Sequence, residues 1–167
     1  MKDRYNVLFV CTGNSARSLM AEALANSLGR ERLRAYSAGS HPEGQVHPVA
    51  MQVLEGAGLS TSNLRSKSWD EFAGPDASEM DLIITVCDRA AGETCPSWPG
   101  HPVTAHWSIP DPVTATGTPE QIQKAFSIAL QTLQQRISLL LALRPDVWDR
   151  LAIKTRLEQV DPIRSTT

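Results

Sequence analysis

One stretch decides the fold of this chain, namely Val7-Leu8-Phe9-Val10-Cys11-Thr12-Gly13-Asn14-Ser15-Ala16-Arg17-Ser18. Its first four residues are β-branched, aliphatic or aromatic, which is typical of a buried strand. The residues that follow are small and polar and include a glycine, and the apolar segment 19–25 after them predicts a helix. We therefore expect a strand, a loop and a helix in direct succession, with the loop at the helix N-terminus.

A loop in that position presents several backbone N–H groups and the positive end of a helix dipole to one point. We expect a lowered pKa for the Cys11 thiol there, because the amides and Arg17 favour the thiolate. The planar guanidinium of Arg17 suits bidentate contact with a tetrahedral oxyanion. The alternative, a buried cysteine near an ion-paired arginine, leaves the polar composition of the loop unexplained. The sequence thus predicts a nucleophile, Cys11, inside an oxyanion cradle of Thr12, Gly13, Asn14, Ser15, Ala16, Arg17 and Ser18.

Length and composition are those of one ordinary globular domain. The chain has 167 residues, of which 41% are hydrophobic and 20% charged, enough to bury a core. Its net charge of −2 favours neither nucleic acid nor an anionic membrane as a partner. No run is apolar and long enough to cross a bilayer, and the N-terminus does not resemble an export signal. With 3 cysteines in such a chain, we expect a cytoplasmic protein with reactive thiols and no disulfide scaffold.

Strand and helix patterns alternate along the rest of the chain. Further strands are predicted over 32–38, 81–86 and 104–107, and helices over 48–55, 68–72 and 118–143. This order predicts an α/β fold with a four-stranded parallel sheet between helices, in three α/β/α layers. Ligands of such sheets bind beyond the carboxyl ends of the strands. We expect the Cys11 loop, the segment 37–39 and Cys87 to meet at that edge.

The last residues are expected to form an addition to this domain. Pro145 stops the long helix, so we place the domain at 1–144 and a C-terminal helical extension at 145–167. Within the extension, 146–161 has the pattern of an amphipathic helix, with Trp148 and Leu151 on one face. We expect it to pack on the domain or on a second subunit.

Two more cysteines follow the strongest strand pattern. If neighbouring strands are parallel, the Cys11 and Cys87 thiols approach disulfide distance, and Cys95 reaches Cys87 only if its segment rearranges. One alternative is that both thiols are buried small apolar groups. Another is a metal site in the series Cys87, Cys95, His101 and His106, although its spacing is looser than that of zinc knuckles.

Asp111 lies between Pro110 and Pro112, and the two prolines restrict the loop around it. A carboxyl group held rigidly at an anion site is a candidate general acid. An Asx-type turn explains the same local sequence equally well.

Together these residues resemble the arsenate reductases that share the low-molecular-weight protein tyrosine phosphatase fold. The matching segments are 10–22, 36–39, Cys87, 95–96 and 106–112, spread over about two thirds of the chain. The resemblance implies a phosphatase-like arsenate reductase domain over 1–144, for arsenic detoxification. It implies arsenate as substrate, with phosphate or sulfate as a mimic, and neither a metal nor an organic cofactor. Phosphatases of this fold need only the loop cysteine and the aspartate, so Cys87 and Cys95 favour the reductase.

The resemblance also implies roles for the site residues. Cys11 attacks arsenate, Arg17 and the loop hold its oxygens, and Asp111 protonates the leaving oxygen. Cys87 then releases arsenite by forming a disulfide with Cys11. Cys95 attacks that bond at Cys87, which leaves a Cys87–Cys95 disulfide. Thioredoxin reduces the final Cys87–Cys95 bond, although the sequence leaves glutathione with glutaredoxin, or mycothiol, open as the reductant.

Three departures from the relatives matter. Ala16 replaces a second loop cysteine found in some of them. The interval from Cys87 to Cys95 is one residue longer than in the thioredoxin-linked relatives. Some relatives hold a potassium ion with residues that match Asn14, Glu22 and Ser37, but Lys67 stands where the fourth ligand, an aspartate, belongs. We expect the lysine ammonium to replace the cation. A protein tyrosine phosphatase and a non-catalytic oxyanion-binding module remain the alternatives.

Overall fold

The sheet has the strand order β2-β1-β3-β4, and each neighbouring pair is parallel. The computed structural model describes residues 4–87, 99 and 102–143. The strands are β1 (Tyr5–Cys11), β2 (Leu33–Gly39), β3 (Leu82–Thr85) and β4 (Val103–His106). The prediction of a four-stranded parallel sheet is confirmed, with strand bounds within two residues of those expected.

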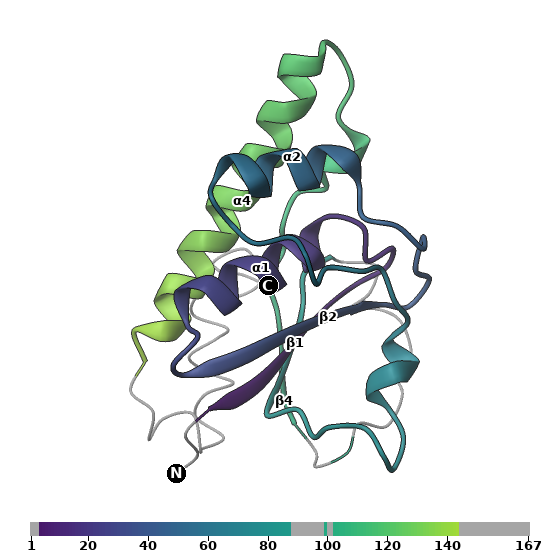
Figure 1. The fold of residues 1–167 in the computed structure, drawn as a ribbon, viewed down its shortest axis with the longest axis vertical. Helices are drawn as coiled ribbons and strands as arrows, with labels where there is room; N and C mark the ends of the chain where they lie inside the picture. The colour runs from purple at the N-terminus through teal and green to yellow at the C-terminus, as the bar shows by residue number, and fades with distance from the viewer. Residues whose placement is uncertain (1–3, 88–98, 100–101, 144–167) are drawn as a thin grey trace.

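Within the described residues, three α-helices and two 3-10 helices accompany the sheet. They are α1 (Arg17–Leu28), α2 (Pro48–Gly56), η1 (Trp69–Phe72), η2 (Pro112–Thr114) and α4 (Pro119–Leu141). Helix α1 packs on β1 and β2, and α4 packs in turn on α1 and α2. Figure 1 shows the long α4 running past both shorter helices. The apolar side chains of α4 that face the core are buried from Phe126 to Leu140.

Both faces of the central strand are covered. Consecutive residues 7–10 of β1 are all at most 1% exposed, although their side chains alternate between the two faces. On one of these faces the ring of Trp107 lies 6.0 Å from that of Phe9. A strand buried on both sides is what the three-layer prediction requires.

Local side-chain signals set the helix bounds. Thr118 Oγ1 accepts a hydrogen bond from the Gln121 amide at 3.2 Å, and Gln121 Oε1 accepts one from the Thr118 amide at 2.8 Å. This reciprocal pair is a capping box, which sets the start of α4. The Ser68 hydroxyl likewise accepts from the Asp70 amide and begins η1.

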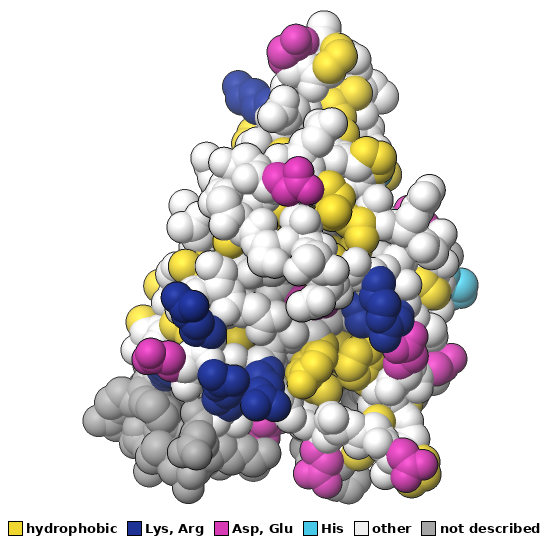
Figure 2. Space-filling view, in the orientation of Figure 1, with side chains coloured by type: hydrophobic (Ala, Val, Ile, Leu, Met, Phe, Trp, Pro, Cys, Tyr) yellow, Lys and Arg dark blue, Asp and Glu magenta, His cyan; other side chains and the backbone are white. Residues whose placement is uncertain are grey.

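The edge strand β2 is protected by a side chain of α1. Asn26 accepts a hydrogen bond from the Ala35 amide at 2.8 Å and donates one to the Ala35 carbonyl at 3.0 Å. The amide side chain thus occupies the place of a further strand. Figure 2 shows apolar side chains between β2 and η1, where the rings of Tyr36 and Phe72 lie 5.7 Å apart.

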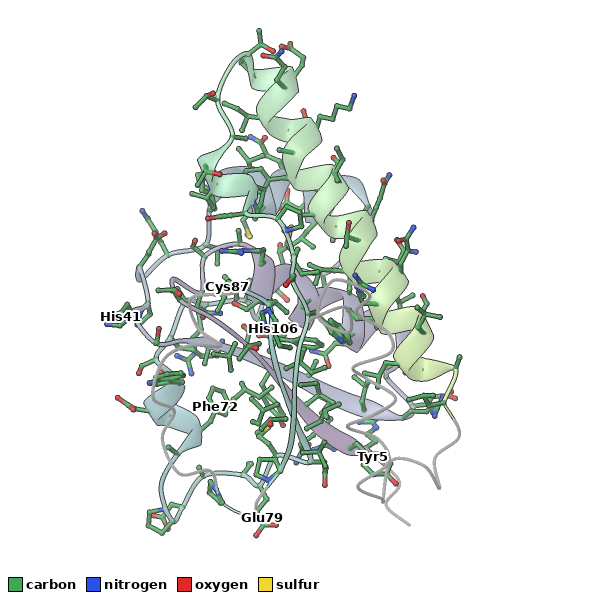
Figure 3. The ribbon with its side chains drawn as sticks, turned by 180° about the vertical axis from the view of Figure 1, so that it is seen from behind. Tyr5, His41, Phe72, Glu79, Cys87 and His106 are labelled. Atoms are coloured by element: carbon green, nitrogen blue, oxygen red, sulfur yellow. The ribbon has the colours of Figure 1, made fainter. Side chains whose placement is uncertain are left out.

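The register brings the strand ends to one edge. Cys11 lies opposite Gly39, Val10 opposite Thr85, and Thr85 opposite His106. Figure 3 shows Cys87 and His106 at this end, with Tyr5 and Glu79 toward the other. The sequence-based expectation for this edge is confirmed. The C-terminal extension at 145–167 lies outside the described residues, and no described helix is apolar and long enough for a membrane span.

Candidate active site

The loop after β1 is held from outside by its carbonyl groups. The carbonyls of Cys11, Thr12, Gly13 and Ser15 accept hydrogen bonds from the amides of Ser40, His41, Glu43 and His47, at 2.8 to 3.2 Å. Because these carbonyls face the segment 40–47, the loop turns its amides toward its own centre. Helix α1 begins at Arg17, directly after the loop, and has no side-chain cap, so no capping side chain occupies its first amides.

Close approach of β2 to the loop requires a glycine. A Cβ atom on Gly39 would lie 2.6 Å from the Thr12 carbonyl oxygen and 2.9 Å from Asn14 Cβ. No side chain fits at those distances. Gly39 therefore lets the segment 40–47 run alongside the loop.

Asn14 fixes the loop from within. It has a φ of 46°, the one positive φ of a non-glycine residue in the described part of the chain. Its Oδ1 accepts from the Lys67 amide at 2.8 Å, and its Nδ2 donates to Ser18 Oγ at 2.7 Å. Since this hydrogen-bond set is fully buried, it holds both the loop and the Ser18 hydroxyl in one geometry.

Cys11 lies at the centre of these contacts. Its Sγ lies 2.9 Å from Ser18 Oγ and accepts a hydrogen bond from the Asn14 amide at 3.2 Å. Burial raises the pKa of the thiol above its ordinary value, whereas the Ser18 and Asn14 hydrogen bonds lower it. The sequence-based expectation of a lowered pKa is therefore wrong. The physical reason is that Cys11 is only 4% exposed and that Arg17 is engaged by other groups.

We expect Ser18→Ala to raise the pKa of Cys11 further, because the thiolate loses its side-chain donor while its burial remains. A raised thiol pKa means that the thiolate fraction, and the alkylation rate with it, keeps rising through and beyond pH 9. The rate of Cys11 alkylation by iodoacetamide, followed on its peptide by mass spectrometry, measures this. In Ser18→Ala the plot of alkylation rate against pH should shift to higher pH as a whole. A curve that levels off near pH 7 in the unaltered protein contradicts the assignment.

Arg17 and Asp111 face each other across the mouth of the loop. Arg17 Nη1 donates to the Ile109 carbonyl at 3.0 Å, and Nη2 lies 3.4 Å from Asp111 Oδ2. The other oxygen of Asp111 accepts from the Val113 amide at 3.0 Å and begins η2. The two interpretations of Asp111 are thus compatible, since one oxygen makes the turn and the other faces Arg17.

Cys87 opens onto the same site as Cys11. A pocket of about 600 Å³ contains both cysteines, Arg17 and Asp111, with Ile109, Pro110 and Val113 among its other walls. Cys87 Sγ lies 3.4 Å from the Thr12 hydroxyl. Nearby, His106 Nδ1 lies 2.8 Å from the Thr85 hydroxyl and Nε2 lies 3.1 Å from the Ser108 hydroxyl. The prediction that Cys11 and Cys87 gather at one edge is confirmed.

Two of the predicted residues lie outside the described part of the chain. These are Cys95, the third thiol, and His101 of the alternative metal series. Within 4–87, 99 and 102–143, no group of three or more His, Cys, Asp or Glu side chains is arranged to hold a metal ion.

The Lys67 ammonium lies beside Glu22 and Ser37, two of the three residues that match potassium ligands of the relatives, whereas Asn14 accepts from the Lys67 backbone amide. Its Nζ lies 3.6 Å from Glu22 Oε1 and 3.4 Å from Ser37 Oγ, and it donates to the Arg65 carbonyl at 2.9 Å. The Ser37 hydroxyl donates to the same Glu22 oxygen at 2.6 Å. Burial lowers the pKa of Lys67 and raises the pKa of Glu22. The ammonium thus lies in a small polar cluster directly behind the loop.

Several contributors to the site are absent from the sequence-based prediction. The segment 40–47 supports the loop, and Glu43 borders the pocket. Their roles depend on backbone amides and on the path of one connection, neither of which produces a recognisable residue pattern. The turn-forming Pro42 and Gly44 indicate only that the chain bends there.

Comparison with known proteins places these features in context. Residues 6–149 match the family model described as low molecular weight phosphotyrosine protein phosphatase. The chain is 36% identical to an arsenate reductase of Bacillus subtilis (strain 168) over 115 residues, 69% of this chain and 79% of that protein. It is 36% identical to an arsenate reductase of Bacillus licheniformis over 132 residues, 78% of this chain and 91% of that protein. Among solved structures, "An arsenate reductase in the phosphate binding state" aligns with a TM-score of 0.66 and 29% identity, covering 83% of this chain and 97% of that one.

Proposed function

This chain belongs to the low molecular weight phosphotyrosine protein phosphatase family, and within that family we propose that it reduces arsenate to arsenite. One observation supports the reductase most directly: a second thiol, Cys87, shares the pocket of Cys11. A phosphatase of this fold transfers a phosphoryl group to one cysteine and has no use for a second. A reductase needs a second thiol, because the reduction of As(V) to As(III) consumes two electrons.

In the first step the Cys11 thiolate attacks arsenic and an oxygen leaves as water. The loop amides and Arg17 hold the remaining oxygens, where they stabilise the negative charge of the transition state. The proton for the leaving oxygen comes from Asp111, whose Oδ2 faces Arg17 at the mouth of the pocket. The product is a Cys11–arsenic bond, with arsenic still at the higher oxidation state.

In the second step the Cys87 thiolate attacks Cys11 Sγ. A sulfur–sulfur bond forms, the sulfur–arsenic bond breaks, and its electron pair leaves with arsenic as arsenite. The hydroxyl of Thr12, 3.4 Å from Cys87 Sγ, is a donor for this second thiolate. Cys95 then attacks Cys87 Sγ, frees the Cys11 thiolate and leaves a Cys87–Cys95 disulfide. We assign these roles to the three cysteines from their chemistry and from the resemblance.

An external thiol reductant closes the cycle by reducing that last disulfide. We propose thioredoxin, a cytoplasmic setting that keeps the thiols reduced, and no cofactor. Purified protein supplied in turn with thioredoxin, glutaredoxin and mycoredoxin systems is the test, with arsenite measured by mass spectrometry. Arsenite formation in multiple turnovers with at least one system supports the proposal. Failure with all three, under conditions where an aryl phosphate is hydrolysed, favours the phosphatase.

The pocket walls also favour a small inorganic oxyanion over a phosphotyrosine side chain. Ile109, Pro110 and Val113 border the mouth, and no Phe, Tyr or Trp is among its described lining residues. A phosphatase that binds an aryl ester gains from aromatic contacts on the ring. Among the described lining residues, the side chains at the mouth are aliphatic and the one aromatic ring is the imidazole of His41.

The Lys67–Glu22 pair leads to a prediction about potassium. Because the ammonium already lies against Glu22 and Ser37, we expect the arsenate reductase rate to change by less than about twofold when sodium is replaced by potassium, since the two salts screen charges equally at one ionic strength. Steady-state rates at constant ionic strength measure this. A several-fold gain in potassium contradicts the substitution of a cation by Lys67.

A paired substitution tests whether the same lysine supports the fold. Lys67→Met leaves the Glu22 carboxylate, 13% exposed, without its partner, so we expect it to destabilise the protein by about 3 kcal/mol. The double variant Glu22→Gln and Lys67→Met removes both charges and should recover most of that loss. Urea unfolding of the three proteins measures both effects. Equal destabilisation by the single and double variants indicates a packing role and no electrostatic one.

A further inference from the structure

Two carboxylates border the Cys11 pocket, and the proposed function uses only Asp111. The other, Glu43, belongs to the segment that supports the loop, and its amide donates to the Gly13 carbonyl at 2.9 Å. Its side chain covers the loop glycine. A Cβ atom on Gly13 would lie 3.3 Å from Glu43 Cγ and 3.5 Å from Oε1. An exposed carboxylate thus lies beside Gly13 at the border of the pocket, next to an anion cradle whose other polar groups are mostly donors.

A carboxylate in this position treats oxyanions differently according to their protonation. It repels every anion, but it accepts a hydrogen bond from an anion that still carries a proton. Arsenate and phosphate keep at least one proton near neutral pH, whereas sulfate has none. We propose that Glu43 is a specificity-determining residue that favours protonated tetrahedral oxyanions over sulfate in the Cys11 pocket.

Asp111 does not serve this purpose. Its Oδ1 accepts from the Val113 amide and its Oδ2 pairs with Arg17. In the proposed mechanism it also donates a proton, so it cannot at the same time be an acceptor for the anion. Among the described lining residues, Glu43 is the remaining carboxylate, and it has no ion-pair partner in the described part of the chain.

The inference rests on the proposed function only in naming arsenate as the natural anion, since it concerns binding alone. The test therefore needs no turnover. Phosphate and sulfate are titrated as protectants of Cys11 against iodoacetamide, and modification is followed on the Cys11 peptide. Glu43→Gln removes the charge and keeps the shape. Glu55→Gln, on the exposed surface of α2 and outside the pocket lining, removes the same charge elsewhere.

We expect Glu43→Gln to tighten sulfate binding by about fivefold or more and to change phosphate binding by less than about twofold, because the hydrogen bond that the phosphate O–H donates becomes weaker with a neutral amide oxygen as acceptor, which offsets the lost repulsion. Glu55→Gln should change neither constant. Equal tightening of both anions in Glu43→Gln would overturn the proposal, because it indicates repulsion without hydrogen bonding. The proposal would also be overturned if Glu43→Gln changed the binding of neither anion, or if Glu55→Gln changed binding in the same way. Failure of arsenate reduction in the unaltered protein would refute the proposed function and leave this result standing.

Discussion

Cys11→Ser should abolish both arsenate reduction and aryl phosphate hydrolysis, by at least about 10⁴-fold. In the unaltered protein the Cys11 sulfur lies 2.9 Å from Ser18 Oγ, and a serine hydroxyl at position 11 retains this contact. The hydroxyl ionises far less readily than the thiol, however. The oxyanion cradle remains, since its amides and Arg17 are unchanged. Phosphate should therefore still bind, and titration calorimetry measures this next to the two activity assays.

A matched control separates chemistry from folding. Cys87→Ser alters a thiol in the same pocket but leaves the first nucleophile in place, so its aryl phosphate hydrolysis should persist. If Cys11→Ser keeps more than about 1% of either activity while binding phosphate normally, Cys11 is not the nucleophile, because loss of a nucleophile costs far more than that. The loop would then be a binding module.

The buried strand and the helix caps were predictable because they are local. The composition of residues 7–10 alone predicts a strand. The spacing of Thr118 and Gln121 indicates the start of α4. Once the strands are parallel, their carboxyl ends must meet. The common location of Cys11 and Cys87 follows from that topology, without any knowledge of side-chain contacts.

Electrostatic detail was not predictable in the same way. The expected proximity of Arg17 to the thiolate assumes that the guanidinium is free, but Ile109 and Asp111 engage it, 92 residues and more along the chain. Desolvation of Cys11 likewise depends on how tightly α1 and its neighbours pack around the sulfur. Both quantities are properties of the tertiary structure, which is why the pKa expectation was wrong although the loop was correctly identified.

The support of the loop depends on connections that have no sequence signature. Its carbonyls accept from four amides of the segment 40–47, and any residue except proline supplies an amide. Lys67 is the opposite case. Its identity differs from that expected of a cation ligand, and that single departure led to the correct expectation that its ammonium lies beside Glu22 and Ser37.

Cys87→Ser should lower the multiple-turnover rate of arsenite formation by at least about 10³-fold, while aryl phosphate hydrolysis stays within about threefold. The reason is that hydrolysis uses one thiolate and water. Reduction needs a second thiolate, which forms a disulfide with Cys11 and leaves the electron pair of the sulfur–arsenic bond on arsenic. The serine hydroxyl preserves a polar group beside the Thr12 hydroxyl, so the pocket is otherwise little changed. Parallel assays with arsenate plus reductant and with an aryl phosphate measure the divergence.

Cys95→Ser sharpens this comparison, because it interrupts the cascade one step later. With Cys87 intact, a Cys11–Cys87 disulfide still forms, so this variant should release a single equivalent of arsenite in a burst and then stop. Cys87→Ser should show no burst. Rapid quenching with arsenite quantified by mass spectrometry distinguishes the two, and the disulfide is identified in the quenched protein. Full multiple-turnover reduction by Cys87→Ser would show that electrons reach arsenic without the second thiol of the pocket, and the three-cysteine cascade would have to be abandoned.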